Sequence, residues 1–225
     1  MKTIRLTLIS AALLAAFGTA RAADTNQLLQ GWFQAQTNMH TWSADAVQTR
    51  ALRNFSQPLV STGKVWVAMP DRFRWELGQP PQTIAVREPK ELVLIYPRLK
   101  RAEKYSLAGN QPGPWRDALA LLEASFPRSR AQLESRFRVA SVAETNGTVT
   151  VSLEPKSGFA KRFMKVVDVG FKSTDFTPVF TELKFSDGSS MRNDFSQSVL
   201  NEPISDSLFR PELGGDYNIS EPLKN

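Results

Sequence analysis

The sequence predicts an α+β protein that is mainly β: a curled antiparallel sheet of about eleven strands, with apolar helical elements over its concave face. Apolar residues near the N-terminus recur at helical spacing, whereas most of the chain from Trp42 onward alternates apolar and polar residues with the period of a strand. Pro, Gly, Asn and Asp separate these alternating runs, and such short connections favour antiparallel neighbours. A sheet this large tends to curl, and helices can cover the concave face that results.

The first 22 residues have the pattern of an export signal. Lys2 and Arg5 precede a short apolar run, and Ala20-Arg21-Ala22 forms an A-x-A cleavage site. The run contains about a dozen residues, which is short for a bilayer span. We therefore expect residues 1–22 to be a signal peptide and residues 23–225 to form a single domain. A membrane anchor or a first helix of the domain is the alternative.

A helix is expected from Thr25, which can serve as its N-cap, to about Met39. Its apolar and aromatic face carries Leu28, Leu29, Trp32, Phe33, Gln36 and Met39. Six strands are expected next, at residues 42–54, 58–69, 72–78, 82–88, 91–96 and 99–107.

The strand pattern then breaks. Pro114 suits the first turn of a helical stretch that ends at Phe126-Pro127, and a short helix follows at about 129–136. Asn146-Gly147 between two alternating runs is a strong hairpin signal. The remaining expected elements are strands at 139–144, 149–153, 162–171, 178–186 and 190–200, a helical turn at 206–209 and a short strand at 217–219.

Alternation selects candidate residues for the interior. Phe73, Trp75 and Leu77 share one face of their strand, and charged residues occupy the other. The interior that they face is either an ordinary core or a cavity for an apolar ligand. We chose as candidate cavity-wall residues Trp66, Phe73, Trp75, Leu77, Ile84, Val86, Leu92 and Leu94, and as candidate lid residues Trp32, Phe33, Leu119 and Leu122.

The composition narrows the function. The chain has no Cys and a single His, His40, so disulfides and thiolate metal sites are excluded, and no G-x-S-x-G, H-E-x-x-H, Walker A or G-x-G-x-x-G motif occurs. We expect no catalytic residue, metal or cofactor, and a capping or surface role for His40 at the end of its helix. Loss of the three signal cations lowers the net charge from +6 to +3, which does not indicate a nucleic-acid partner.

A resemblance to a known family rests on several segments. They are Gly63-Lys64-Val65-Trp66-Val67-Ala68-Met69-Pro70, Arg72-Phe73-Arg74-Trp75-Glu76, Pro80-Pro81, the stretch from Leu92 to Tyr96-Pro97, and Ser207-Leu208-Phe209. Together they resemble the LolA-type outer-membrane lipoprotein carriers of Gram-negative bacteria, over essentially the whole mature chain. The resemblance implies a monomeric periplasmic half-barrel, lidded by helices, that shields the acyl chains of lipoproteins or related lipids between the inner and outer membranes.

The same resemblance implies an inner-membrane transporter of the LolCDE type and an outer-membrane receptor of the LolB type as partners. One position departs from the pattern: in these carriers a basic residue precedes the Pro and helps to hold the lid, whereas this chain has Met69. A methionine cannot donate a hydrogen bond to lid carbonyls. The lid is then held by packing, or the chain is a paralogue with another opening cycle and another lipid.

Two further possibilities remain from the sequence. A basic run from Arg98 to Lys104 could meet anionic headgroups or an acidic partner, or could be a solvated strand edge. The alternative functions are a periplasmic sensor that binds a lipid or lipoprotein and regulates a partner, and a lipid hydrolase. Such sensors usually carry a second domain, and the hydrolase is suggested only by an apolar cavity beside polar loops.

Overall fold

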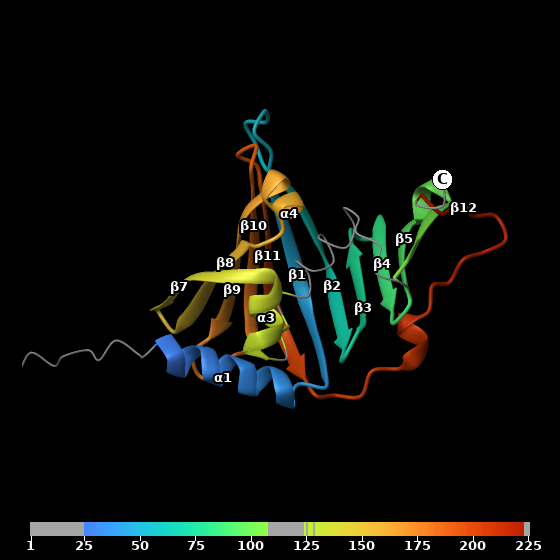
Figure 1. Ribbon diagram of the computed structural model, residues 1–225. Coiled ribbons are helices and arrows are strands. Elements are labelled where there is room, and N and C mark those ends of the chain that lie inside the picture. Colours follow the sequence, from blue (N-terminus) through green and yellow to red (C-terminus); the bar gives the residue numbers. More distant parts are fainter. Residues whose placement is uncertain (1–24, 108–123, 125, 128, 223–225) are drawn as a thin grey trace, which may run out of the picture.

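The computed structural model describes residues 25–107, 124, 126–127 and 129–222, and in this part of the chain twelve strands form one open, curled sheet (Figure 1). The strand order is β12-β6-β5-β4-β3-β2-β1-β11-β10-β9-β8-β7. The strands are β1 (Thr41–Ala51), β2 (Leu59–Ala68), β3 (Arg72–Leu77), β4 (Thr83–Glu88), β5 (Glu91–Tyr96), β6 (Arg101–Ser106), β7 (Phe137–Thr145), β8 (Thr148–Pro155), β9 (Met164–Lys172), β10 (Pro178–Phe185), β11 (Ser190–Leu200) and β12 (Asn218–Ser220).

The expected mainly β architecture is therefore confirmed. Strands β1–β6 form one antiparallel meander and β7–β11 form another, and β1 joins the two by pairing with β11. The short strand β12 differs because it pairs in parallel with β6. This pairing covers the edge of β6 with the end of the chain.

In the described part of the chain, the helices other than α1 are short. The helices are α1 (Thr25–Asn38), α3 (Arg130–Arg136) and α4 (Gly158–Phe163), with 3-10 turns η1 (Pro97–Leu99) and η2 (Asp206–Phe209). The side-chain oxygen of Ser129 caps α3 by accepting the N–H of Gln132, and Ser157 caps α4 by accepting the N–H of Ala160. Helix α4 occupies the place where the sequence predicts the start of the strand at 162, so that strand begins only at Met164.

One face of the sheet is concave and holds the main core. Leu29 and Trp32 of α1 and Leu133 of α3 pack there against β8 and β9. The partners on these strands are Val149, Val151, Leu153, Val167, Val169 and Phe171. Helices α1 and α3 thus lie over the half of the sheet formed by β7–β9 (Figure 1).

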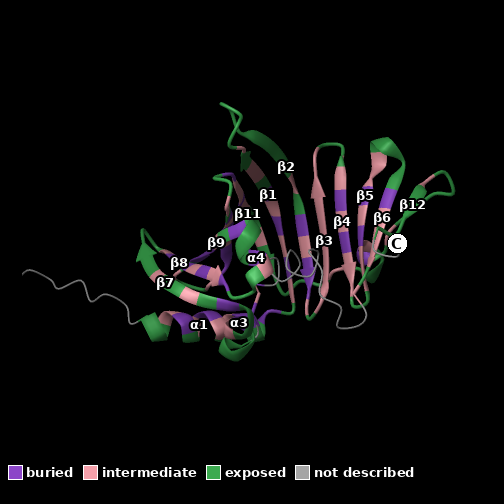
Figure 2. Ribbon diagram, turned by 45° about the horizontal axis from the view of Figure 1, so that its top comes forward, coloured by how far each residue is buried: buried purple, intermediate pink, exposed green. Residues whose placement is uncertain are grey.

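The other face of the sheet has a smaller core of its own. Ile84, Val86, Val93, Ile95 and Ala102 form a buried cluster on β4–β6, and Leu213 and Tyr217 of the C-terminal segment pack against it. Buried and partly exposed positions accordingly alternate along β4 and β5 (Figure 2). The sheet therefore buries apolar side chains on both faces, beneath helices on one side and beneath the C-terminal segment on the other.

Candidate ligand-binding cavity

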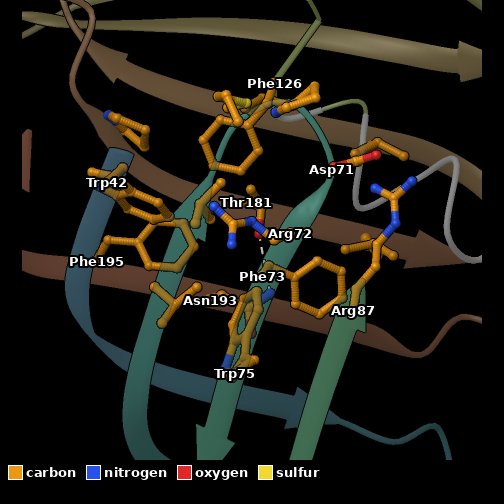
Figure 3. Close-up of a pocket in the computed structure, with 18 of the residues that line it drawn as sticks. Trp42, Asp71, Arg72, Phe73, Trp75, Arg87, Phe126, Thr181, Asn193 and Phe195 are labelled. Atoms are coloured by element: carbon orange, nitrogen blue, oxygen red, sulfur yellow. Dashed lines mark hydrogen bonds between the residues drawn. The ribbon is translucent and has the colours of Figure 1, made fainter. Parts of the chain in front are cut away.

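A cavity of about 380 Å³ lies on the concave face, between β1–β3 on one side and β9–β11 on the other (Figure 3). Its volume falls within the range of about 300–1,000 Å³ that is usual for ligand pockets. Its described wall is mainly apolar and aromatic. The lining residues are Trp42, Val65, Val67, Met69, Pro70, Asp71, Arg72, Phe73, Trp75, Arg87, Phe126, Gln132, Arg136, Val167, Val169, Pro178, Thr181, Leu183, Asn193 and Phe195.

Strand register explains why these residues meet. Val67 pairs with Phe73 and Val65 with Trp75, so all four project to the concave side. Across the junction of the two meanders, Ala46 pairs with Phe195 and Gln48 with Asn193. Curling of the sheet then brings β9 and β10 opposite β2 and β3.

Aromatic rings form the centre of the wall (Figure 3). Phe195 meets Trp42 edge to face, with ring centroids 4.9 Å apart, and lies 5.9 Å from the ring of Trp75. The ring centroid of Phe126 lies 5.4 Å from that of Trp42. Offset and edge-to-face contacts of this kind stabilise aromatic clusters beyond their area of burial. The result is a continuous aromatic surface at the centre of the wall.

The polar and charged side chains among the described lining residues are Asp71, Arg72, Arg87, Gln132, Arg136, Thr181 and Asn193. The side chain of Asn193, which is 2% exposed, donates to Thr181 Oγ1 at 3.0 Å and accepts from Gln48 Nε2 at 3.0 Å. The Trp75 indole N–H is buried and has no hydrogen-bond partner. A buried donor without a partner costs about 1–3 kcal/mol. The Trp75 N–H is therefore an unsatisfied donor beside the aromatic centre of the wall.

Two arginines of β3 hold the C-terminal segment. Arg72 Nη1 donates to Asp206 Oδ1 at 2.6 Å and its guanidinium lies 5.1 Å from the centroid of the Phe209 ring. Arg74 donates to the carbonyl oxygen of Leu208 at 3.2 Å and to Glu76 at 2.6 Å. The hydrogen bond and positive charge of Arg72 lower the pKa of Asp206 below its ordinary value.

The structure distributes the predicted cavity-wall residues over both faces. Phe73 and Trp75 line the cavity. Leu77, Leu92 and Leu94 share the concave face by register but lie outside the set of described lining residues.

The expected cavity positions of Trp66, Ile84 and Val86 are wrong. Arg74 of β3 pairs with Trp66 of β2 and with Val86 of β4. Because Arg74 points away from the face of Phe73 and Trp75, Trp66 and Val86 do so too. Ile84 pairs with Glu76 and belongs with Val86 to the cluster beneath the C-terminal segment. Alternation groups residues within one strand, but only the pairing register shows which groups of neighbouring strands share a face.

Met69 lies at the rim of the cavity, beside Pro70, and packs against the cluster that contains Trp42. Its backbone N–H donates to the carbonyl oxygen of His40 at 2.8 Å, which ties the β2–β3 turn to the segment between α1 and β1. His40 itself is exposed, and its N–H donates to Asn201 Oδ1. Among the described residues, no group of three or more His, Asp or Glu side chains is arranged to hold a metal ion.

The candidate lid residues fall into two groups. Trp32 is fully buried, 4.6 Å from the ring of Phe171 and stacked at 5.3 Å on Phe33. Leu119 and Leu122 lie outside the described residues. The sequence analysis missed Trp42, Phe195 and Asn193 of the wall. Phe195 and Asn193 alternate on one face of a predicted strand, but only the pairing of β11 with β1 brings that face beside Trp42.

The architecture is thus an open, curled sheet with a mainly apolar cavity on its concave face. Residues 37–212 match the model of the family described as outer membrane lipoprotein carrier protein LolA, and the chain belongs to this family. Members of this family are carrier and binding proteins of the periplasm. No helix in the described ranges has the length and apolar character needed to cross a bilayer.

Individual relatives agree with this assignment. The chain is 27% identical, over 80% of its length and 81% of the relative, to an outer-membrane lipoprotein carrier protein of Dechloromonas aromatica, and 28% identical, over 85% and 83%, to one of Coxiella burnetii. A conserved protein of uncharacterized function from Thermus thermophilus has the same fold, with a TM-score of 0.50 at 11% identity over 87% of this chain and 98% of that one.

Proposed function

We propose that this chain is an exported periplasmic carrier that takes up the acyl chains of lipoproteins, or of related lipids, and shields them between the inner and outer membranes. The observation that carries the proposal is the apolar cavity walled by Trp42, Phe73, Trp75 and Phe195 beneath the curled sheet. The family membership supplies the class of cargo. In this proposal the protein binds its cargo and catalyses no reaction.

The energetics of such cargo require a cover that costs free energy to displace. Each buried methylene contributes about 0.8 kcal/mol, so the tens of methylenes in two or three acyl chains would contribute tens of kcal/mol. Non-covalent affinities saturate near about −20 kcal/mol, and a carrier must also release its load. A lid that packs on the sheet when the cavity is empty offsets part of the gain from binding.

Helix α1 packs on β8 and β9 beside the cavity, and no α1 residue is among the described lining residues; we propose that it serves as such a lid. Trp32 and Leu29 bury its apolar face, yet Trp32 Nε1 and Gln36 Oε1 are buried with no hydrogen-bond partner. Each unpaired group costs about 1–3 kcal/mol while the helix stays packed. The packed state of α1 is therefore stable but weakened, and we propose that cargo displaces it.

The resemblance to the family places Met69 where the carriers have a lid-holding basic residue. The β2–β3 turn is joined to the end of α1 through the Met69–His40 backbone hydrogen bond, and the side chain contributes packing. We propose that packing and this backbone contact, without a side-chain hydrogen bond from position 69, hold the lid in this chain.

The remaining parts of the proposal follow from the sequence and the family. Residues 1–22 direct export, and residues 23–225 act as a single monomeric domain. An inner-membrane transporter of the LolCDE type would load the carrier, and an outer-membrane receptor of the LolB type would unload it.

The test is mass spectrometry of the mature protein, purified without detergent from its native periplasm, together with a matched pair of variants. Trp75→Ala opens the cavity wall, whereas Trp66→Ala removes the same side chain from the opposite face. We expect co-purified acyl species in the wild type and in Trp66→Ala, and a several-fold lower amount in Trp75→Ala.

Three outcomes bear on the proposal. An acylated lipoprotein fragment would identify a general lipoprotein carrier, and another defined lipid would identify a dedicated paralogue. A cavity that is empty in the wild type and does not bind lipid on reconstitution would contradict the carrier proposal and favour the sensor.

A further inference from the structure

One end of the sheet carries an unusual concentration of exposed apolar side chains. Among the described residues, all the large hydrophobic side chains that are more than half exposed lie there: Phe55 (63%), Leu59 (51%), Val60 (60%), Leu99 (66%) and Phe163 (56%). They belong to residues 52–60, 97–100 and 158–163, which we call the apolar-basic rim. Scattered exposed hydrophobics are normal, but their concentration on one surface indicates an interaction site.

Strand direction and hydrogen bonds place the three segments at the same end. Residues 52–60 connect β1 to β2, and the N–H of Arg53 donates to Ser189 Oγ in the β10–β11 turn. The start of the same turn contacts α4, because the N–H of Ser186 donates to the carbonyl oxygen of Phe163 at 2.9 Å. The β1–β2 hairpin, the β10–β11 turn and α4 accordingly lie close together at the top of Figure 1.

The third segment, residues 97–100, lies at this end because the strands of the meander alternate in direction. It connects β5 to β6, three strand positions from β2. At about 4.8 Å between neighbouring strands, this corresponds to roughly 14 Å along the sheet. The opposite end of the strands carries the β2–β3 turn that borders the cavity, so the rim is separate from the cavity mouth at Met69 and Pro70.

The charge of the rim has one sign. Its three segments contain Arg53, Arg98, Lys100, Lys161 and Arg162 and not a single Asp or Glu. Two carboxylates border it: Asp187 lies near Arg53, and Asp216 pairs with Lys100 at 3.0 Å. The cations still outnumber these neighbouring carboxylates.

We propose that the apolar-basic rim docks the protein onto an anionic lipid surface. Exposed aromatic and aliphatic side chains with cations beside them are the two elements of interfacial membrane binding: the apolar tips enter the boundary of the acyl region while Lys and Arg meet the phosphates. The three rim segments present their exposed apolar side chains along one end of the sheet, an arrangement that suits a planar, deformable surface. This inference goes beyond cargo binding, since no rim residue lines the cavity.

The experiment is co-sedimentation of the mature protein with vesicles of phosphatidylcholine alone and of equimolar phosphatidylcholine and phosphatidylglycerol. One variant, Arg98→Glu/Lys161→Glu/Arg162→Glu, reverses rim charge, and a second, Phe55→Ser/Leu99→Ser/Phe163→Ser, removes the tips. The control, Lys90→Glu/Lys172→Glu, reverses two exposed cations at the opposite end of the strands. Circular dichroism checks that each variant is folded.

We expect the wild type and the control to bind the anionic vesicles and to be released by salt. Each cation near an anionic leaflet strengthens binding by about fivefold, so the triple charge reversal weakens it by roughly a hundredfold or more. Loss of binding in the serine variant would show that the tips insert. Absence of binding by the wild type, or equal weakening by the control, would overturn the proposal; a rim that instead captured an acidic protein would do the same.

Because vesicle binding is measured without cargo, its failure leaves the carrier proposal intact. Conversely, an empty cavity in the co-purification experiment does not alter the expected binding of the rim to anionic vesicles. If the serine variant fails to fold, the salt dependence of the wild type and the charge-reversal variant still decide the question.

Discussion

At the scale of single residues, the cavity wall is built from aromatic side chains that lie far apart in the sequence. Trp42, Trp75 and Phe195 come from β1, β3 and β11 and touch through ring contacts. Asn193 is the one buried amide among them, and both of its polar ends are engaged. Such a group fixes the local pairing of β1, β10 and β11 without breaking the apolar surface.

We predict that Asn193→Ala lowers the free energy of unfolding by about 1–3 kcal/mol, because Gln48 Nε2 and Thr181 Oγ1 each lose their partner in a buried site. Urea denaturation measures the change. Asn218→Ala in the exposed strand β12 is the control and should change the stability by less than about 0.5 kcal/mol. Equal effects of the two substitutions would show that the buried amide contributes nothing specific.

A second residue-scale prediction concerns pH. Arg72 lowers the pKa of Asp206, so the carboxylate contributes stability above its ordinary pKa of 3.8, and this contribution is lost as the pH falls below that value. In Arg72→Gln the pKa of Asp206 should rise toward 3.8. An NMR titration of the side-chain carboxyl measures it, with Asp187, whose pKa is lowered chiefly by the N–H of Ser189, as the internal control. An unchanged Asp206 titration would disprove the assignment of the cause.

At the scale of elements, α1 combines deep burial with incomplete hydrogen bonding. Trp32 packs on Phe171 of β9, while Gln36, one turn later on the same face, keeps an unpaired oxygen. A helix that served as permanent core would gain from an apolar residue at position 36. Its glutamine is consistent with a face that becomes exposed in part of the working cycle.

We predict that Gln36→Leu raises the free energy of unfolding by about 1–3 kcal/mol, since it removes the buried unpaired oxygen. The same change should reduce cargo uptake, because the packed lid becomes harder to displace. Thermal denaturation and lipid loading measure the two effects. Gln30→Leu, on the exposed side of α1, is the control. Greater stability with unchanged loading would contradict a lid role for α1.

At the scale of the whole molecule, the sheet is covered on both faces by different parts of the chain. Helices α1 and α3 cover the concave side of β7–β9, and the C-terminal segment covers the other side of β4–β6. The same segment ends in β12, which covers the edge of β6. An uncovered sheet edge or apolar face promotes aggregation.

We predict that truncation after Arg210 lowers the free energy of unfolding by about 2 kcal/mol or more, because Leu213 and Tyr217 no longer cover Ile84, Val86 and Ile95. Denaturant unfolding and light scattering measure the loss of stability and the expected self-association. Removal of residues 223–225 alone is the control. A truncated protein as stable and monomeric as the full chain would refute this role of the C-terminal segment.

The sequence predicted the mainly β class, most strand positions and the family, because period-two alternation, turn residues and the segments around Trp66 and Phe73 are local properties. It also placed Phe73 and Trp75 together on one face of β3. It could not place Trp66, Ile84 or Val86, because the relative phase of neighbouring strands depends on pairing register. Tertiary structure alone brought Phe195 against Trp42 and Trp75, and gathered Phe55, Leu99 and Phe163 at one end, because these contacts arise from the β1–β11 pairing and the curl of the sheet.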